Sequence, residues 1–218
     1  IEKMAATYHD AFLTVSDITA NECKYLLGRE PDAVTPNGFE NDFVWSGDEY
    51  YTKRDEARKA MITVAEACLG EKFTGDPLIV GTSGRYEFRN KGIDVFIESL
   101  KQLAASDRLR REVLAYITVP AANRGPRADL QAHLADPSKP IDGGQYKYTT
   151  HYLEYQSSDP IVNALNGSIL TTPDSKGKVI FVPTYLNKAD GIFGKDYYEL
   201  LVGMDITVFP SYYEPWGY

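Results

Sequence analysis

The chain has 218 residues, of which 43% are hydrophobic and 25% charged, a balance that is ordinary for a globular protein with a buried core. Its formal net charge of −8 argues against a nucleic-acid-binding surface, so an anionic ligand would need a local cluster of positive charge. There is no apolar run of about eighteen residues and no signal-peptide start, so we expect no membrane span and a cytoplasmic location.

Short apolar runs alternate with longer helical patterns from the start of the chain. Ser16 is a good helix N-cap, and Gly28 and Gly70 are each placed to end a helix. In chain order, the first half contains a strand at 11–15, a helix at 16–27, a strand at 33–35, a helix from about 48 to 69, a strand at 78–82 and, after Gly92, a helix to about 105.

The second half continues this alternation with one interruption. The predicted elements are strands at 113–119, 178–182 and 206–209, and a helix at 195–202. Residues 123–157 are polar, rich in Gly and Pro and poorly periodic, so we interpret them as an excursion from the sheet. Strands that alternate with helices at this spacing predict a parallel α/β architecture, in which ligands bind beyond the carboxyl ends of the strands.

The loop after the strand at 78–82 is the first candidate site. Residues 83–92 read Ser-Gly-Arg-Tyr-Glu-Phe-Arg-Asn-Lys-Gly, which brings Arg85, Arg89 and Lys91 to the start of a helix. The free N–H groups and the positive dipole end of a helix N-terminus favour a phosphate group. A solvated basic turn explains the same spacing equally well.

Aromatic residues and one glutamate follow two further strand ends. Tyr185 comes shortly after the strand at 178–182 and Tyr197 at the head of the next helix; such rings can stack on a base, although packing roles are commoner in a chain with 16 tyrosines. After 206–209 comes Pro-Ser-Tyr-Tyr-Glu-Pro-Trp-Gly-Tyr, in which Glu214 precedes a proline suited to the first turn of a helix.

The sequence predicts no metal site. Cysteines 23 and 68 are too few for a disulfide framework, and Cys68 lies in the apolar stretch 61–69, where a buried thiol is expected. His9, His133 and His151 are widely separated, and we interpret each as a surface or capping residue.

Taken together, these segments resemble the glycogen synthases of the animal and fungal type, glycosyltransferase family three, whose fold is GT-B. The resemblance is carried by residues 14–20 (TVSDITA), 34–38 (VTPNG), 84–92 and 209–218. It implies an internal piece of such an enzyme, with the Rossmann-like parallel sheets of an incomplete GT-B fold. Residues 1–44 would then be the tail of the N-terminal domain, and residues 45–218 most of the C-terminal, nucleotide-sugar-binding domain.

The resemblance also implies an activity, with roles for individual residues. The reaction is retaining transfer of glucose from a nucleotide sugar, UDP-glucose, to the non-reducing end of an α-1,4-glucan such as glycogen, with no metal or other cofactor. Arg85 and Lys91 correspond to the pair that binds the donor diphosphate and stabilises it as it leaves, and Glu214 to the glutamate beside the reacting glucose. The remaining positions contact the donor: Tyr197, whose ring and not its hydroxyl stacks on uracil, Tyr185 in the same cleft, and Trp216, Gly217 and Tyr218 in the loop at the sugar and phosphate.

Two other functions stay open at this point. One is a GT-B transferase with a different sugar or acceptor, and the other is a non-catalytic nucleotide-binding module. The 218-residue chain by itself is expected to be inactive. Whether copies of the chain form a homo-oligomer also stays open.

Overall fold

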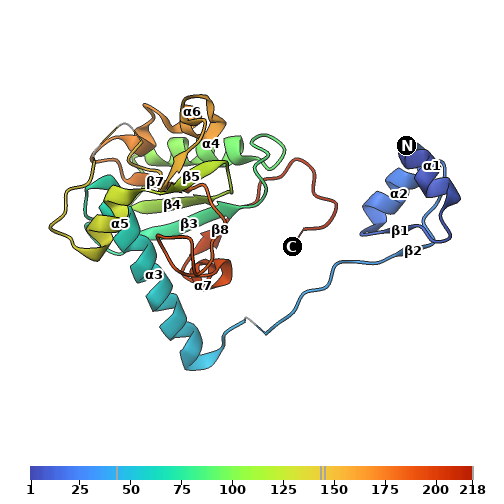
Figure 1. Cartoon of the computed structure of the whole chain (residues 1–218), viewed down its shortest axis with the longest axis horizontal. Helices are drawn as coiled ribbons and strands as arrows, with labels where there is room; N and C mark the ends of the chain where they lie inside the picture. Colours follow the sequence, from blue (N-terminus) through green and yellow to red (C-terminus); the bar gives the residue numbers. More distant parts are fainter. Residues whose placement is uncertain (43, 143, 145, 218) are drawn as a thin grey trace. The chain divides into compact units, whose positions relative to one another are not determined.

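The computed structural model describes residues 1–42, 44–142, 144 and 146–217. The chain divides into two compact units, one formed by Ile1–Val44 with Tyr213–Tyr218 and the other by Trp45–Tyr212 (Figure 1).

The first unit is small and is built on short elements. They are α1 (Glu2–Tyr8), β1 (Leu13–Thr14), α2 (Asp17–Leu26) and β2 (Ala33–Val34), and the two strands pair in parallel. Ser16 caps α2 as predicted: its hydroxyl accepts from Thr19 N at 3.2 Å, while the Thr19 hydroxyl accepts from Ser16 N at 3.1 Å. The helix α1 was not predicted, and the expected strand at 11–15 is only two residues long.

Within the described residues, the second unit is centred on a sheet of four parallel strands, which confirms the predicted α/β class. Its order is β7-β4-β3-β8, formed by Gly177–Val182, Val113–Thr118, Leu78–Ser83 and Ile206–Thr207. Every residue of β4 and β7 is buried, as expected for strands of a sheet covered on both faces.

Helices cover both faces of this sheet. In Figure 1, α4 (Ile93–Ala104) and α6 (Pro160–Leu165) lie on one side, and α3 (Gly47–Leu69) and α7 (Tyr197–Leu201) on the other. Tyr116 of β4 points toward α3, where its hydroxyl donates to Met61 O at 2.6 Å. The prediction that α3 ends at Gly70 is confirmed, because Gly70 adopts the left-handed conformation with φ +70°.

The strand order reverses between β3 and β8. The chain proceeds from β3 to β4 to β7 in one direction, and then crosses back to place β8 on the other side of β3. In an open parallel sheet, the carboxyl ends of two strands at such a reversal border the crevice where ligands bind. The fold therefore directs attention to the loops that follow β3 and β8.

The segment 123–157 lies outside the central sheet, as predicted, but it holds regular elements that the sequence did not predict. This segment contains β5 (Asn123–Pro126), α5 (Ala128–Ala135), β6 (His151–Leu153), which pairs antiparallel with β5, and the 3-10 turn Gln156–Ser158; a second 3-10 turn, Ile169–Thr171, precedes β7. A buried arginine organises it: Arg127 pairs with Asp129 at 2.6 Å and donates to Lys147 O at 2.9 Å. Hydrophobic periodicity does not reveal a segment that is organised around a buried charged side chain.

The expectation for His151 is wrong, whereas that for Cys68 is confirmed. His151 is 2% exposed, its ring lies 2.9 Å from both Thr150 Oγ1 and Asp190 O, and burial lowers its pKa. Cys68 is 1% exposed, and burial raises the pKa of its thiol to about 12.

None of the helices in the described part of the chain combines the length and the apolarity that crossing a bilayer requires. Over the same residues, no three His, Cys, Asp or Glu side chains gather as metal ligands.

Candidate functional site

The loop after β3 is a folded turn held by its own hydrogen bonds. Lys91 N donates to Glu87 O at 2.9 Å, and Gly92 N donates to Arg89 O at 2.8 Å. The Glu87 carboxylate accepts from Asn90 Nδ2 at 2.6 Å and lies 3.2 Å from Arg85 Nε. The Arg85 side chain is nevertheless 77% exposed, so the loop presents it at the carboxyl end of the sheet.

Gly92 joins this loop to the segment that follows β8. Its φ is +64°, and a Cβ added there would lie 1.9 Å from Pro210 O. Next to it, Tyr212 N donates to Asn90 O at 3.0 Å. Only glycine satisfies both the backbone conformation and the close approach, so the two loops at the strand reversal pack directly on one another.

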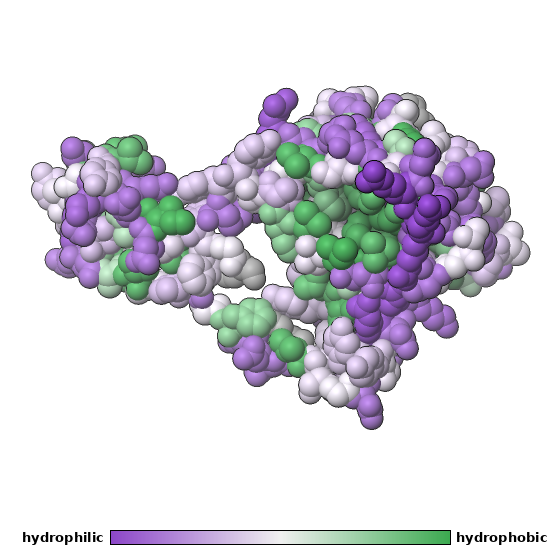
Figure 2. Space-filling model, turned by 180° about the vertical axis from the view of Figure 1, so that it is seen from behind, coloured by the Kyte–Doolittle hydropathy of each residue, from purple (hydrophilic) through white to green (hydrophobic). Residues whose placement is uncertain are grey.

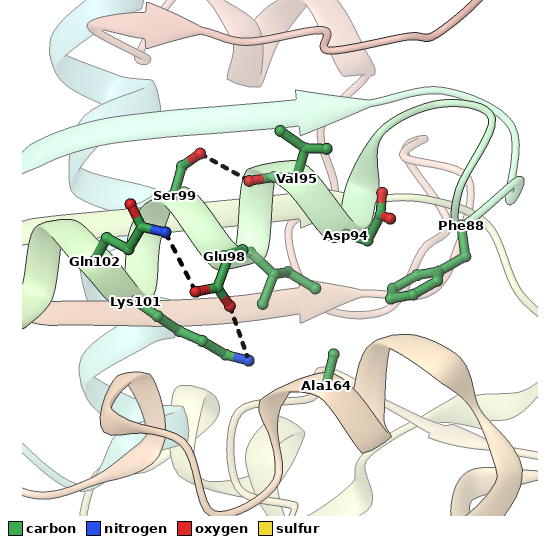
Figure 3. Close-up of a pocket in the computed structure, with 9 residues that line it drawn as sticks. Phe88, Asp94, Val95, Glu98, Ser99, Lys101, Gln102 and Ala164 are labelled. Carbon is green, nitrogen blue, oxygen red and sulfur yellow. Dashed lines mark hydrogen bonds and ion pairs between the residues drawn. The ribbon is translucent and has the colours of Figure 1, made fainter.

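Tyr86 and Phe88 attach the same loop to α6. The Tyr86 hydroxyl accepts from Ile161 N at 3.3 Å, and its ring meets that of Phe181 edge-on at 6.3 Å. Burial, and then the Asp159 carboxylate, hold the pKa of Tyr86 well above its ordinary value. Phe88 lines a groove between α4 and α6 with Val95 and Ala164 (Figure 3).

Tyr197 reaches the end of β3 from a distant part of the chain. It is the first residue of α7, and its hydroxyl lies 2.7 Å from the Oγ of Ser83, the last residue of β3. The Tyr198 ring packs edge-on against it at 5.3 Å, and burial raises the pKa of Tyr197. The structure thus brings Tyr197 to the start of the loop that carries Arg85 and Lys91.

Tyr185 lies on the loop that follows β7 and is 76% exposed. That loop is held by Asp190, whose carboxylate accepts from the N–H groups of Ile192 and Phe193, both at 2.7 Å, and of Gly194 at 3.1 Å. The Asp190 carbonyl accepts from His151 Nε2. Sequence reasoning missed this support, although the Asp-Gly pair at 190–191 is a turn signal that could have indicated it.

The last predicted site residues, Glu214, Trp216 and Gly217, belong to the first unit, and Tyr218 lies outside the described residues. Glu214 is exposed, and the hydroxyl of the preceding Tyr213 donates to Glu22 Oε2 at 2.5 Å. The described residues end at 217, so the expectation that a helix begins at Pro215 stays a prediction. That these residues act together with Arg85 and Lys91 on the donor stays a prediction.

Comparison with known proteins agrees with the resemblance noted from the sequence. The family model described as glycogen synthase matches residues 1–129 and 146–218, leaving out part of the 123–157 segment. The glycogen [starch] synthase of Neurospora crassa is 28% identical over the whole chain and 39% of its own length, and isoform 2 of Saccharomyces cerevisiae is 28% identical over 40% of its length. The liver enzyme of Homo sapiens is 27% identical over 38% of its length, so the chain spans about two fifths of these relatives. By the extent of the family match, the chain belongs to the glycogen synthase family.

Proposed function

We propose that the protein to which this chain belongs transfers glucose, with retention of configuration, from UDP-glucose to the non-reducing end of an α-1,4-glucan. In this proposal residues 45–218 supply most of the nucleotide-sugar-binding domain, and residues 1–44 end the other domain. The observation that supports it most is the convergence of a basic loop and an aromatic ring on the end of β3, where the strand order reverses.

The chemistry needs charges of both signs at the reacting bond. Breaking the bond between glucose C1 and the diphosphate oxygen builds negative charge on the diphosphate and positive charge on the sugar ring. Arg85 and Lys91, together with the N-terminus of α4, stabilise the negative charge in the transition state. Glu214 stabilises the positive charge, and Trp216, Gly217 and Tyr218 contact the sugar and phosphate.

Retention follows if the acceptor hydroxyl attacks from the face that the diphosphate leaves. The new bond joins the acceptor oxygen to C1, and the proton of the acceptor hydroxyl passes to the departing phosphate. The protein contributes the cations that hold the diphosphate in place, while Tyr197 and Tyr185 hold its base.

Two measurements test the proposal. Calorimetric titration of the purified 218-residue chain should show tighter binding of UDP than of ADP or GDP. The full-length parent should extend glycogen from radiolabelled UDP-glucose and form α-linked product. Equal affinity for all three nucleotides, or none for any, would favour a different binding module, and activity only with another sugar donor would indicate a different GT-B transferase.

A further inference from the structure

We propose that Ser83 is a positioning residue that holds the ring of Tyr197 through its hydroxyl, so that the ring face meets the base of the donor. This inference rests on the proposed function, in which Tyr197 stacks on the base. Stacking uses only the ring, so it does not by itself explain why the hydroxyl is bound 2.7 Å from Ser83 Oγ in a partly buried place.

Ser83 is well suited to hold another residue. It is the last residue of β3, and it pairs in register with Thr118 of β4. On the other side, Gly81 of the same strand pairs with Thr207 of β8. Pairing on both sides leaves the backbone of β3 little freedom as far as Gly81, and the pairing with β4 continues to Ser83. The Ser83 hydroxyl therefore extends from a restrained backbone at the edge of the site.

Tyr197 needs an anchor of this kind, because the helix that carries it is short. It begins a helix of five residues that follows the long loop after β7. Tyr198 limits the ring from one side by its edge-on contact. The hydrogen bond to Ser83 restrains the far end of the ring, and so sets the plane that a base would meet.

The bond also ties two parts of the site together. Ser83 stands two positions before Arg85, the proposed ligand of the diphosphate. One short segment thus carries both the anchor of the base platform and the phosphate cation, which fixes their separation. Since positioning is lost steeply with small displacements, losing the anchor should weaken nucleotide binding even though Ser83 makes no stacking contact.

The test is a double-mutant cycle read by calorimetric binding of UDP to the 218-residue chain. Ser83→Ala, Tyr197→Phe and the double variant should each weaken UDP binding by roughly 3- to 10-fold, and the double variant no more than either single one. Ser83→Thr retains a hydroxyl and should bind UDP as the wild type does. Thr118→Val is the matched control: it removes the hydrogen bond from Thr118 Oγ1 to Thr82 O, one strand away, and should leave UDP affinity unchanged.

A loss of UDP-binding free energy in the double variant that equals the sum of the losses in the two single variants would overturn the inference. So would UDP affinity that stays at the wild-type value in both, or that falls equally in Thr118→Val. A wild-type chain that fails to bind UDP contradicts the proposed function and overturns the inference with it. Denaturant unfolding of the four proteins of the cycle (wild type, Ser83→Ala, Tyr197→Phe and the double variant) needs no ligand. Non-additive losses of stability in that measurement would show that the hydrogen bond forms even where UDP does not bind.

Discussion

At the scale of single residues, several side chains of the loop after β3 hold the loop in place, whereas Arg85 projects from it. Tyr86 attaches the loop to α6, while Glu87 and Asn90 bond to one another within it. Arg85 forms an exposed ion pair with Glu87, and such pairs contribute little to stability. Its substitution should therefore change the reaction much more than the fold.

Replacing Arg85 or Lys91 by alanine in the full-length parent should lower turnover by roughly 10²–10³-fold, the scale for losing one contact to transition-state charge. Steady-state assays with UDP-glucose and glycogen measure this effect. Arg108→Ala is the control, because Arg108 is an exposed cation in the turn before β4, at the opposite edge of the sheet. Near-normal turnover in either variant would show that the residue has no part in the reaction.

At the scale of elements, the close approach at Gly92 joins the loops that follow β3 and β8. The αL conformation by itself costs a residue with a Cβ about 1–2 kcal/mol. At Gly92 the contact with Pro210 O adds to this cost, whereas a Cβ at Gly70, which has a similar φ, would meet nothing within 4 Å.

Gly92→Ala should therefore lower the free energy of unfolding by clearly more than Gly70→Ala, which measures the backbone strain alone. The excess is the cost of pushing apart the loops that follow β3 and β8. Urea unfolding of the two variants gives the comparison. Equal losses would mean that the Pro210 segment moves away without cost.

A second set of contacts anchors the start of β8 to α3 and β3. The Asp205 carboxylate accepts from Ile79 N and from Arg58 Nη1, both at 2.8 Å, and also pairs with Arg54. Burial alone would raise the pKa of Asp205, but the bonds from Ile79 and Arg58 and the charges of both arginines outweigh it and hold the pKa below its ordinary value.

A lowered folded-state pKa means that Asp205 stabilises the fold fully above the ordinary carboxyl pKa of about 4, and that this contribution is lost as the pH falls through the folded-state pKa. Asp205→Asn should lower the free energy of unfolding by about 2–4 kcal/mol at pH 7. The difference from wild type should shrink between about pH 5 and pH 3. Urea unfolding across this range is the measurement, and Asp107→Asn, at an exposed site, should show neither effect. A difference independent of pH would argue against an ionised Asp205.

At the scale of the whole molecule, apolar side chains remain exposed on β8 and just after it. Ile206, Val208 and Phe209 are 48%, 37% and 56% exposed. Figure 2 shows that hydrophobic residues gather over part of one face of the larger unit. Contiguous apolar surface of this kind favours association between protein molecules.

We expect the 218-residue chain by itself to self-associate and to transfer no glucose. A GT-B active site lies between two domains, and the first unit of this chain contributes only two strands of two residues among those described. Light scattering during size-exclusion chromatography measures the association, and a radiolabelled donor assay beside the full-length parent measures the transfer. Glucan extension by the purified chain would contradict both the two-domain argument and the placing of a domain boundary near residue 44.

Local pattern was sufficient for the elements that bury continuous apolar runs. The strands at 78–82, 113–119 and 178–182 and the helices that became α3 and α4 were predicted to within one or two residues, because each run carries its own period and its own stop signal. The helix and strands within 123–157 were not predicted, because Arg127 and His151 hold this segment through polar contacts with distant groups.

The sequence by itself determined the α/β class, the family and the residue types available for the site. Only the tertiary structure decided that β8 lies beside β3 and that Tyr197 meets Ser83, 114 residues away in the chain. Helix and strand propensities act over a few neighbouring residues, whereas strand order and such contacts follow from how all the elements bury their apolar faces together. The site is made of contacts of this second kind, so its residues could be named from the chain but not assembled from it.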